Sequence, residues 1–416
     1  MKVALIDSTP LTGRSKGNAY SIALLKIGAM LKSQGHDPEL FVNRLPPAGV
    51  FEEAWITTLF TYHAQHAGGL IRGAKDRVNR VRVGGVAASL LPDYFRRLGA
   101  DVHIGPIPEA ETMIPDYSLL PEPPEYSVIH TSRGCVRKCK FCMVHKLEPE
   151  FKPIEDWETH LAPGAKRILF YDNNWLAKPI SSIREDVAKI KALKAEGRIQ
   201  SVDFNQANDV RLLTEKKADE LVGVPFQPLR FAFDFIAYKD KFLRAVDLMV
   251  ERGFKDFSYY TLYNFEDTPA DFYERIKCSA ILREENGATF ASVPMKYHPI
   301  HEVGSRRDYI GKHWTRRLLG GFAHYLHGHS VTGQISPKGC SLYPPVKEFE
   351  FWFGATPDEF IRLLNFPRAH YLADHRKEKL SIARLAARTS RDRKNGNTAE
   401  NAKNGASRSR EIGEGA

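Results

Sequence analysis

Three of the five cysteines in this chain lie close together, in the stretch "TSRGCVRKCKFC" at 131–142. Cys135, Cys139 and Cys142 have the spacing C-x3-C-x2-C. Thiolates are soft ligands that suit zinc or iron–sulfur clusters. Three thiolates on a short loop can bind three irons of a [4Fe–4S] cluster and leave the fourth iron open. Because an open iron can bind a substrate or cofactor directly, the spacing predicts a reactive metal centre.

A zinc site is the alternative for the same cysteines. His145 follows Cys142 by three residues and could complete a Cys3His site. Structural zinc ligands usually form two separated pairs that hold a small fold together, whereas these cysteines begin a long α/β segment. The spacing therefore favours the cluster. The other two cysteines are expected to stand apart from it, Cys278 as a packing residue in a helix and Cys340 in a Gly/Pro-rich loop.

Polar residues also follow three of the predicted strands after the cysteine loop. Asp172-Asn173-Asn174, Asn205-Gln206 and Asp234 each come directly after an apolar, strand-like run. The carboxyl ends of parallel strands meet at one edge of a barrel or sheet, where active sites are built. Each residue taken singly could instead be a helix N-cap. Together they predict a polar site at the strand ends, next to the cysteines.

The first part of the chain must form one α/β unit. Amphipathic stretches at about 18–34, 66–78 and 88–98 predict helices. Gly84-Gly85 lies between a strand and a helix, as a tight turn requires. The pattern predicts a Rossmann-like, doubly wound domain over 1–120, ending in the Pro-rich segment 115–126. Its predicted strands are 3–7, 39–42, 54–60, 80–85 and 101–105.

A second α/β series follows and carries the cysteines. Six strands separated by helices predict a partial (β/α)6 TIM-type barrel over 121–305. A helical, aromatic-rich extension is expected over 306–385 and a disordered basic tail over 386–416. The predicted strands are 126–132, 167–172, 201–206, 229–234, 257–263 and 289–297, and the predicted helices are 182–196, 213–222, 239–252 and 269–285.

Composition excludes some classes of protein. Hydrophobic residues make up 43% of the chain and charged residues 26%, as in globular proteins. No run of about eighteen apolar residues appears, and "MKVALIDSTP" lacks the apolar region of a signal peptide. We therefore expect a cytoplasmic protein without a membrane partner. The net charge of +10 permits a nucleic-acid partner but does not indicate one.

The cysteine loop resembles the signature of radical S-adenosylmethionine (SAM) enzymes, including the aromatic Phe141 before the third cysteine. The resemblance covers 126 to about 300. It implies a [4Fe–4S] cluster on Cys135, Cys139 and Cys142, whose open iron binds SAM and cleaves it reductively to a 5′-deoxyadenosyl radical. It also implies an electron donor such as flavodoxin or ferredoxin. The fold it implies is a radical SAM barrel.

Further residues are carried over from this resemblance. "YDNNW" resembles the motif that contacts the SAM amino group, which implies Asp172 for the ammonium, with Asn173 and Asn174 beside it. "DFNQANDVRLL" resembles the third-strand stretch of cobalamin-type radical SAM proteins. It implies Gln206, Asp209 and Arg211 near the cofactor, with Arg211 either pairing with the SAM carboxylate or forming a surface ion pair. The last cofactor-binding residue carried over, Asp234, ends the fourth strand in "FAFDF".

The first unit resembles the cobalamin-binding domain that precedes many radical SAM barrels. "AWITTLFTYH", "VRVGGVAASLLPD" and "IPDYSLLP" carry the resemblance. The D-x-H-x-x-G motif that supplies a histidine ligand to cobalt is absent, so cobalamin is a possible but doubtful cofactor. If it binds, its tail is expected in a groove lined by Thr57, Thr58 and Gly84-Gly85.

The sequence thus predicts a radical SAM enzyme with an unassigned substrate and a possible methyl- or group-transfer reaction. One alternative is a tRNA methylthiotransferase-like enzyme, although residues 1–134 lack the three further cluster cysteines of that family. An alternative of a different class is a zinc-stabilised, non-catalytic nucleic-acid-binding protein.

Overall fold

Five parallel strands form the first sheet of the computed structural model, which describes residues 1–10, 20–303, 308–331, 341–342 and 346–365. The strand order is β2-β1-β3-β4-β5, with every pair parallel, which is the doubly wound order expected from the sequence. The strands are β1 (Lys2–Asp7), β2 (Asp37–Val42), β3 (Glu53–Thr57), β4 (Arg80–Gly84) and β5 (Asp101–Val102). The predicted tail at 386–416 and Cys340 lie outside the described residues.

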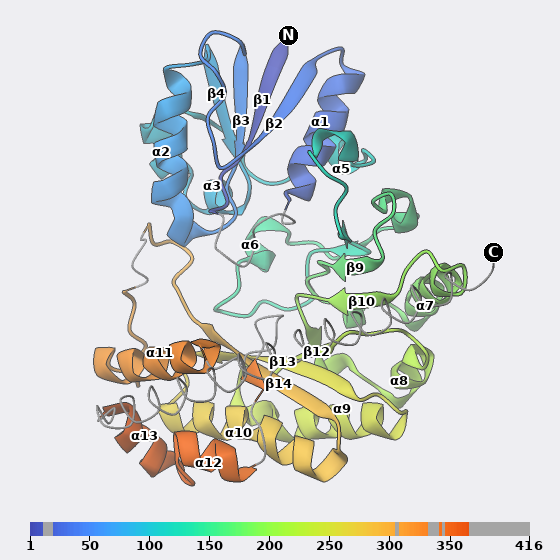
Figure 1. Cartoon of the computed structure of the whole chain (residues 1–416), viewed down its shortest axis with the longest axis vertical. Helices are drawn as coiled ribbons and strands as arrows, with labels where there is room; N and C mark the ends of the chain where they lie inside the picture. Colours follow the sequence, from blue (N-terminus) through green and yellow to red (C-terminus); the bar gives the residue numbers. More distant parts are fainter. Residues whose placement is uncertain (11–19, 304–307, 332–340, 343–345, 366–416) are drawn as a thin grey trace, which may run out of the picture.

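Helices cover both faces of this sheet because its central strands are apolar on both sides. On one face, Val3 and Leu5 pack against α1 (Ile22–Ser33) and α5 (Pro108–Glu111). On the other, Ala4 and Ile6 belong to a core with α2 (Ala64–Lys75), α3 (Val86–Leu90) and α4 (Pro92–Arg97). Figure 1 shows α2 on one side of the sheet and α1 with α5 on the other. The helix predicted at 88–98 is divided in two because Pro92 begins a new one.

The second α/β series contains two further sheets. One has the order β10-β9-β6, and the other has β11-β12-β13-β14-β15. A parallel bridge between Val202 and Phe226 links β10 to the segment just before β12. All strand pairs in these two sheets are parallel except β14–β15. The strands are β6 (Tyr126–Ile129), β9 (Arg167–Phe170), β10 (Ser201–Phe204), β11 (Asn208–Asp209), β12 (Leu229–Ala232), β13 (Asp256–Tyr263), β14 (Thr289–Lys296) and β15 (Ser341–Leu342).

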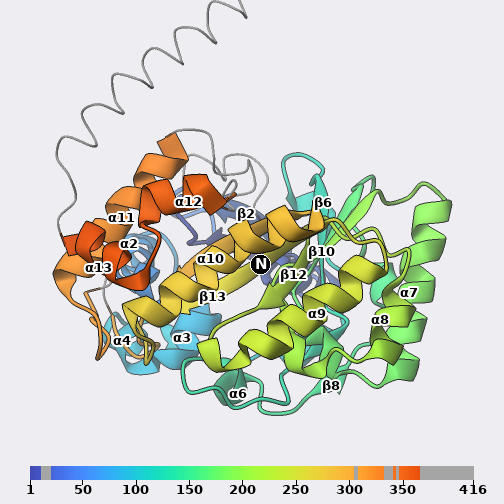
Figure 2. The same ribbon diagram turned by 90° about the horizontal axis from the view of Figure 1, so that it is seen from below.

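Four helices pack on the outside of these strands, as Figure 2 shows from below. They are α7 (Ile180–Ala195), α8 (Glu215–Leu221), α9 (Lys239–Glu251) and α10 (Pro269–Asn286). A large apolar core fills the space between helices and strands, and it includes Cys278, which is buried as predicted. Thr268 and Asp271 form a capping box at the start of α10. The parallel α/β class predicted from the sequence is confirmed.

The last helices pack against α10. They are α11 (Arg316–Val331), α12 (Val346–Phe353) and α13 (Pro357–Asn365), the last beginning at a proline. Their shared core contains aromatic side chains of α10, α11 and α13, among them Phe272, Phe322 and Phe360. Within the described residues, none of the helices has the length and apolar character needed to span a bilayer.

Candidate functional site: a cysteine loop and a cavity on either side of one segment

The cysteine loop (134–142) begins just after β6. A short strand, β7 (Ser132–Arg133), follows β6 and pairs in antiparallel register with β8 (Lys152–Pro153). Gly134 has φ of +73°, and a Cβ at this position would overlap the carbonyl oxygen of Glu150. Only glycine therefore fits between β7 and the first cysteine, which fixes the direction in which the loop leaves the strand. The loop ends at α6 (Val144–Leu147).

The first thiol of the loop receives two hydrogen bonds. Cys135 Sγ accepts from the backbone N–H of Arg137 at 3.4 Å and from Asn174 Nδ2 at 3.6 Å. Asn174 is buried, and its Oδ1 has no hydrogen-bond partner among the described residues. Donors of this kind stabilise a thiolate ligand and tune the potential of an iron–sulfur cluster. Asn174 was expected near the cofactor, and the structure places it against a proposed cluster ligand.

The other two thiols, of Cys139 and Cys142, are also partly buried and also accept hydrogen bonds. Burial raises the pKa of Cys139, and a hydrogen bond and charge from Arg211 oppose that rise. Burial also raises the pKa of Cys142, whereas a hydrogen bond from the backbone N–H of Val144 to the thiol lowers it. The nearby thiols raise both pKa values further. A bound metal cation reverses this balance because it stabilises the thiolate. The three thiols are thus a donor set that suits a metal centre.

The arrangement of the thiols bears on which metal centre fits. In the part of the chain that the structure describes, no three His, Cys, Asp or Glu side chains converge as ligands of one metal ion. A Cys3His zinc site requires such convergence on a single ion. An iron–sulfur cluster does not, because each thiolate binds a different iron. The described residues therefore contain no preformed Cys3His site.

A small pocket beside the cysteine loop brings together five of the residues predicted for the site. Its wall is formed by the loop, by β11 and the turn after it, and by the end of β12. The predicted residues converge although they come from three separate stretches of sequence. The pocket is lined by Cys139, Phe141, Asp209, Val210, Arg211, Ala232, Asp234, Phe235 and Tyr238.

Asp209 anchors two arginines at this pocket. Its carboxylate accepts from Arg211 Nε at 2.6 Å and Nη2 at 2.9 Å, and from Arg137 Nε at 3.0 Å. Burial alone would raise the pKa of Asp209, but the bonds and charge from Arg211, helped by Arg137, hold it below its ordinary value. The Arg211 guanidinium also lies over the Tyr238 ring and donates to its hydroxyl at 2.9 Å. Arg211 thus forms an ion pair with Asp209, in which its side chain is 21% exposed and that of Asp209 is 9% exposed.

Asp234 and Phe141 face the same pocket, whereas Gln206 does not line it. Burial raises the pKa of Asp234 to about 6, although Arg275 and Arg211 lower it. Phe141 contacts Phe235 and Phe265, with ring centres 5.8 Å and 5.9 Å away. Gln206 is exposed to solvent.

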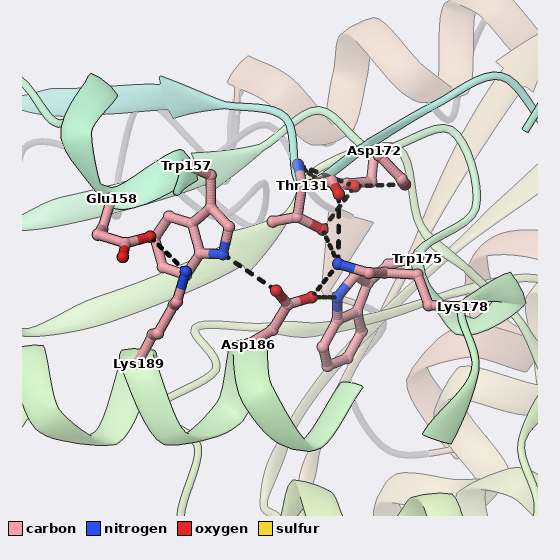
Figure 3. A network of polar contacts seen from close by, with 9 residues as sticks. Thr131, Trp157, Glu158, Asp172, Trp175, Lys178, Asp186 and Lys189 are labelled. Carbon is pink, nitrogen blue, oxygen red and sulfur yellow. Dashed lines mark hydrogen bonds and ion pairs between the residues drawn. The ribbon is translucent and has the colours of Figure 1, made fainter. Parts of the chain in front are cut away.

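Asp172 lies beneath the cysteine loop, where its carboxylate already accepts hydrogen bonds from three donors. It accepts from the backbone N–H of Thr131 at 3.1 Å, from Thr131 Oγ1 at 2.9 Å and from Ser132 Oγ at 2.6 Å. Lys178 Nζ in turn contacts Thr131 O at 3.2 Å (Figure 3). Burial raises the pKa of Asp172 to about 6, partly offset by these hydrogen bonds. The geometry favours a supporting role for Asp172 over the expected contact with an ammonium group.

The support beneath the loop continues to α7 through a buried ion pair (Figure 3). Lys178 Nζ lies 2.6 Å from Asp186 Oδ2, and both side chains are almost fully buried. Asp186 also accepts from the indoles of Trp157 at 3.0 Å and Trp175 at 2.7 Å. This network therefore fixes the residues that precede the cysteines to the outer helix. Sequence reasoning missed Lys178 and Asp186, which no motif marks.

Glu148 is a second residue that the sequence did not reveal. Its carboxylate accepts from the backbone N–H of Gly134 at 2.8 Å and from Asn173 Nδ2 at 3.2 Å. It also pairs with Arg133 at 2.7 Å. Asn173, predicted for the cofactor, thus acts here on the start of the cysteine loop. The only sequence signal for Glu148 is its place six residues after the last cysteine.

A large cavity lies on the other side of this segment. Its volume is about 860 Å³, and its wall runs along the face of the first sheet that carries α1 and α5. Thr57, Thr58, Gly84 and Gly85 all line it, as the groove hypothesis expected. The second α/β series closes the cavity with residues that include His130, Arg133, Leu147, Glu148 and Tyr171.

The cavity mouth is shaped by tight backbone contacts at the strand ends. Gly85 has φ of +95°, and a Cβ there would overlap the carbonyl oxygen of Thr58. Thr58 is buried and caps α3, since its Oγ1 accepts from Ala88 N at 2.9 Å. At Gly84, by contrast, a Cβ would make only ordinary contact with His103. Gly84 is therefore the glycine whose missing side chain leaves space in the cavity itself.

The solved structures that are similar to this chain include two of the same protein. One is TsrM, a radical SAM methyltransferase from Kitasatospora setae, with cobalamin and a [4Fe–4S] cluster bound. It has a TM-score of 0.54 and 13% identity, over 88% of this chain and 85% of that one. The other is the same methyltransferase with its tryptophan substrate and the SAM analogue aza-SAM. It has a TM-score of 0.51 and 14% identity, over 71% of this chain and 73% of that one.

This chain shares the fold of the TsrM structures. The match spans both α/β units, so the resemblance drawn from the sequence is confirmed at the level of the fold. No family model matches the chain, and no curated protein matches it either.

Proposed function

We propose that this protein is a cobalamin-dependent radical SAM methyltransferase whose substrate is unassigned. The fold of TsrM supports this proposal, as do the three free thiols of the cysteine loop and the cavity beside it. The tRNA methylthiotransferase-like and zinc-protein alternatives are not favoured.

One observation carries the proposal: a single segment borders both the cysteine loop and the cavity. Arg133, Leu147 and Glu148 line the cavity, while Glu148 holds Gly134 at the start of the loop. The cluster site and the cavity are thus separated by a few residues only. Group transfer between cofactors requires such proximity, because reacting groups must meet within a few ångströms.

When bound, the three groups would supply a low-potential electron, an activated methyl donor and a cobalt that carries a methyl group. The thiols of Cys135, Cys139 and Cys142 would hold the cluster. In the small pocket, Arg211 is the candidate for the SAM carboxylate. We assign the ammonium contact to Asp234 in place of Asp172, because Asp234 lines the pocket and Asp172 is used beneath the loop. Phe141 and its aromatic neighbours would exclude water.

An electron donor such as flavodoxin or ferredoxin is part of the proposal, since reductive cleavage consumes an electron. Cobalamin would occupy the 860 Å³ cavity. The thiols suit the cluster, and the open backbone at Gly84 leaves room for a ligand at the strand ends. No histidine of a D-x-H-x-x-G loop is required by this arrangement.

The proposal is tested on anaerobically purified protein. We expect about four irons and four sulfides per chain, and retention of hydroxocobalamin through gel filtration. With SAM and a reductant, release of S-adenosylhomocysteine would support methyl transfer, and release of 5′-deoxyadenosine would support radical cleavage. Protein that binds one zinc and no iron would contradict the proposal.

Cysteine variants provide the matched control. Replacing Cys135, Cys139 or Cys142 with alanine should abolish the iron content in each case. Cys278→Ala should retain it, because Cys278 is buried in the core of the second series. Iron bound equally by all four variants would remove the cysteine loop from the site.

A further inference from the structure

One wall of the cavity carries a stacked arginine and tryptophan. Trp55 on β3 and Arg82 on β4 are register partners, and their side chains lie on the cavity face of the sheet. The guanidinium carbon of Arg82 is 4.9 Å from the centre of the Trp55 ring. This pair presents a flat surface, with cation–π attraction holding its two layers together.

A buried carboxylate fixes the arginine in place. Glu53 accepts from Arg82 Nε at 3.1 Å and Nη2 at 3.5 Å, and from Trp55 Nε1 at 3.0 Å. The Glu53 side chain is only 11% exposed. Both members of the stack are therefore held by one acceptor, which restricts the rotation of each.

One nitrogen of the stack is left over on Arg82, a residue that lines the cavity. The Arg82 side chain is 36% exposed, and within the described residues its Nη1 has no hydrogen-bond partner. Its positive charge is balanced by Glu53, so the site does not present the excess charge that an anion would select. What it presents is a planar group with the two free N–H donors of Nη1.

The depth of the stack indicates which part of a ligand reaches it. Trp55 and Arg82 lie two residues before the strand ends at Thr57 and Gly84. Residues on one face of a strand are about 7 Å apart, so the stack lies about that far inside the cavity mouth. A broad macrocycle near the cysteine loop would lie outside the cavity mouth, whereas a narrow, flexible appendage of the ligand could reach the stack.

We propose that Arg82, stacked on Trp55 and anchored by Glu53, recognises the nucleotide base of a cobalamin bound in this cavity. The inference rests on the proposed function. A base that does not ligate cobalt has a free ring nitrogen, which accepts a hydrogen bond. Arg82 offers N–H donors for that nitrogen, in a plane that Trp55 and Glu53 hold in place. This residue therefore sets the specificity for a complete corrinoid over one that lacks the nucleotide.

The test compares two ligands on purified holoprotein carrying its cluster. Hydroxocobalamin carries the nucleotide tail and cobinamide lacks it. Arg82→Met should weaken cobalamin binding about tenfold, the loss of one hydrogen bond. Cobinamide affinity should not change. Arg82→Lys keeps the charge but not the plane and should also lose affinity for cobalamin alone.

Arg80→Met is the matched control. Arg80 lies on the same strand and also pairs with Glu53, at 3.7 Å, but it does not line the cavity. It should leave both affinities unchanged. The visible spectrum of bound cobalamin gives a second readout, because it reports whether the base is off the cobalt, and Arg82→Met should shift it toward the base-on form.

Four outcomes would overturn the inference. Equal losses for both ligands would mean that the substitution damages the cavity wall in general, and no loss for either would remove Arg82 from the site. If the wild-type protein binds neither corrinoid, the corrinoid part of the proposed function fails too. If it binds both equally while releasing S-adenosylhomocysteine, the proposed function stands and only the inference fails.

Discussion

The carboxylates at the strand ends take different roles because their surroundings differ. Asp209 is held charged by two arginines, whereas burial raises the pKa of Asp172 and Asp234 to about 6. Asp172 lies among hydroxyl and backbone donors of the loop, and Asp234 faces the small pocket. The position of an acid at a strand end therefore does not determine which of them can contact a ligand.

The sequence could predict part of this site and not the rest. The cysteine spacing and the polar strand ends indicated residues that do converge, notably Cys139, Asp209, Arg211 and Asp234. Glu148 could not be found, because it acts through contacts formed only when β7 and the loop after α6 come together. Local spacing carries the metal ligands, whereas tertiary packing decides which neighbours support them.

The buried Lys178–Asp186 pair gives a prediction at this scale. Lys178→Met leaves the Asp186 carboxylate buried without its counter-charge, which should cost about 3–5 kcal/mol in the free energy of unfolding. Lys178→Met with Asp186→Asn should recover part of that loss, since an amide carries no charge. Urea unfolding followed by circular dichroism measures both.

Lys189→Met serves as the control for this prediction. Lys189 also lies on α7 and pairs with Glu158 at 2.9 Å, but its side chain is 33% exposed. Replacing Lys189 should lower the free energy of unfolding by no more than about 1 kcal/mol. Equal effects of the two lysine substitutions would show that burial does not determine the strength of the network.

At the scale of elements, most strands and helices form where apolar periodicity predicts them. β13 and α10, for example, match the expected ranges to within one residue at each end. β5 is shorter than its apolar run because only Asp101–Val102 pair with β4. Periodicity marks which residues face a core, but hydrogen-bonded register decides how far a strand continues.

The turn between β4 and α3 provides a prediction for this scale. Gly85→Ala should destabilise the protein by roughly 1–3 kcal/mol, because its φ is +95° and a Cβ would overlap Thr58. Gly84→Ala should be close to neutral. Thermal unfolding of the two alanine variants measures the difference.

Substitutions in the same turn distinguish an effect on ligand binding from an effect on folding. Gly84→Val should reduce hydroxocobalamin retention while leaving the unfolding temperature and iron content near those of the wild type, because its side chain would occupy cavity space. Gly85→Val is a poorer probe, since a loss of binding would follow from the damaged turn. Unchanged retention by Gly84→Val would argue against a ligand at these strand ends.

At the scale of the whole molecule, the first sheet and the second series are joined at the edge of β6. β6 lies at the end of the order β10-β9-β6 and so has one unpaired edge. The Tyr20 hydroxyl donates to Tyr126 O at 2.9 Å and accepts from Val128 N–H at 3.0 Å. Figure 1 shows the two α/β units above and below this junction. One side chain of the first unit thus pairs with the exposed edge of the second.

This junction predicts the effect of Tyr20→Phe. The phenyl ring keeps the stacking against Tyr126, whose ring centre is 5.6 Å away, but the buried Val128 N–H loses its acceptor. We expect a loss of about 1–3 kcal/mol in the free energy of unfolding. Hydrogen–deuterium exchange should become faster in peptides covering 126–131, the segment that leads into the cysteine loop.

Tyr94→Phe is the control, since the Tyr94 hydroxyl makes no hydrogen bond within the described residues. If exchange at 126–131 is the same in both variants, the edge of β6 is protected without Tyr20. Faster exchange in Tyr20→Phe alone would mean that the first unit stabilises the strand from which the cysteine loop departs.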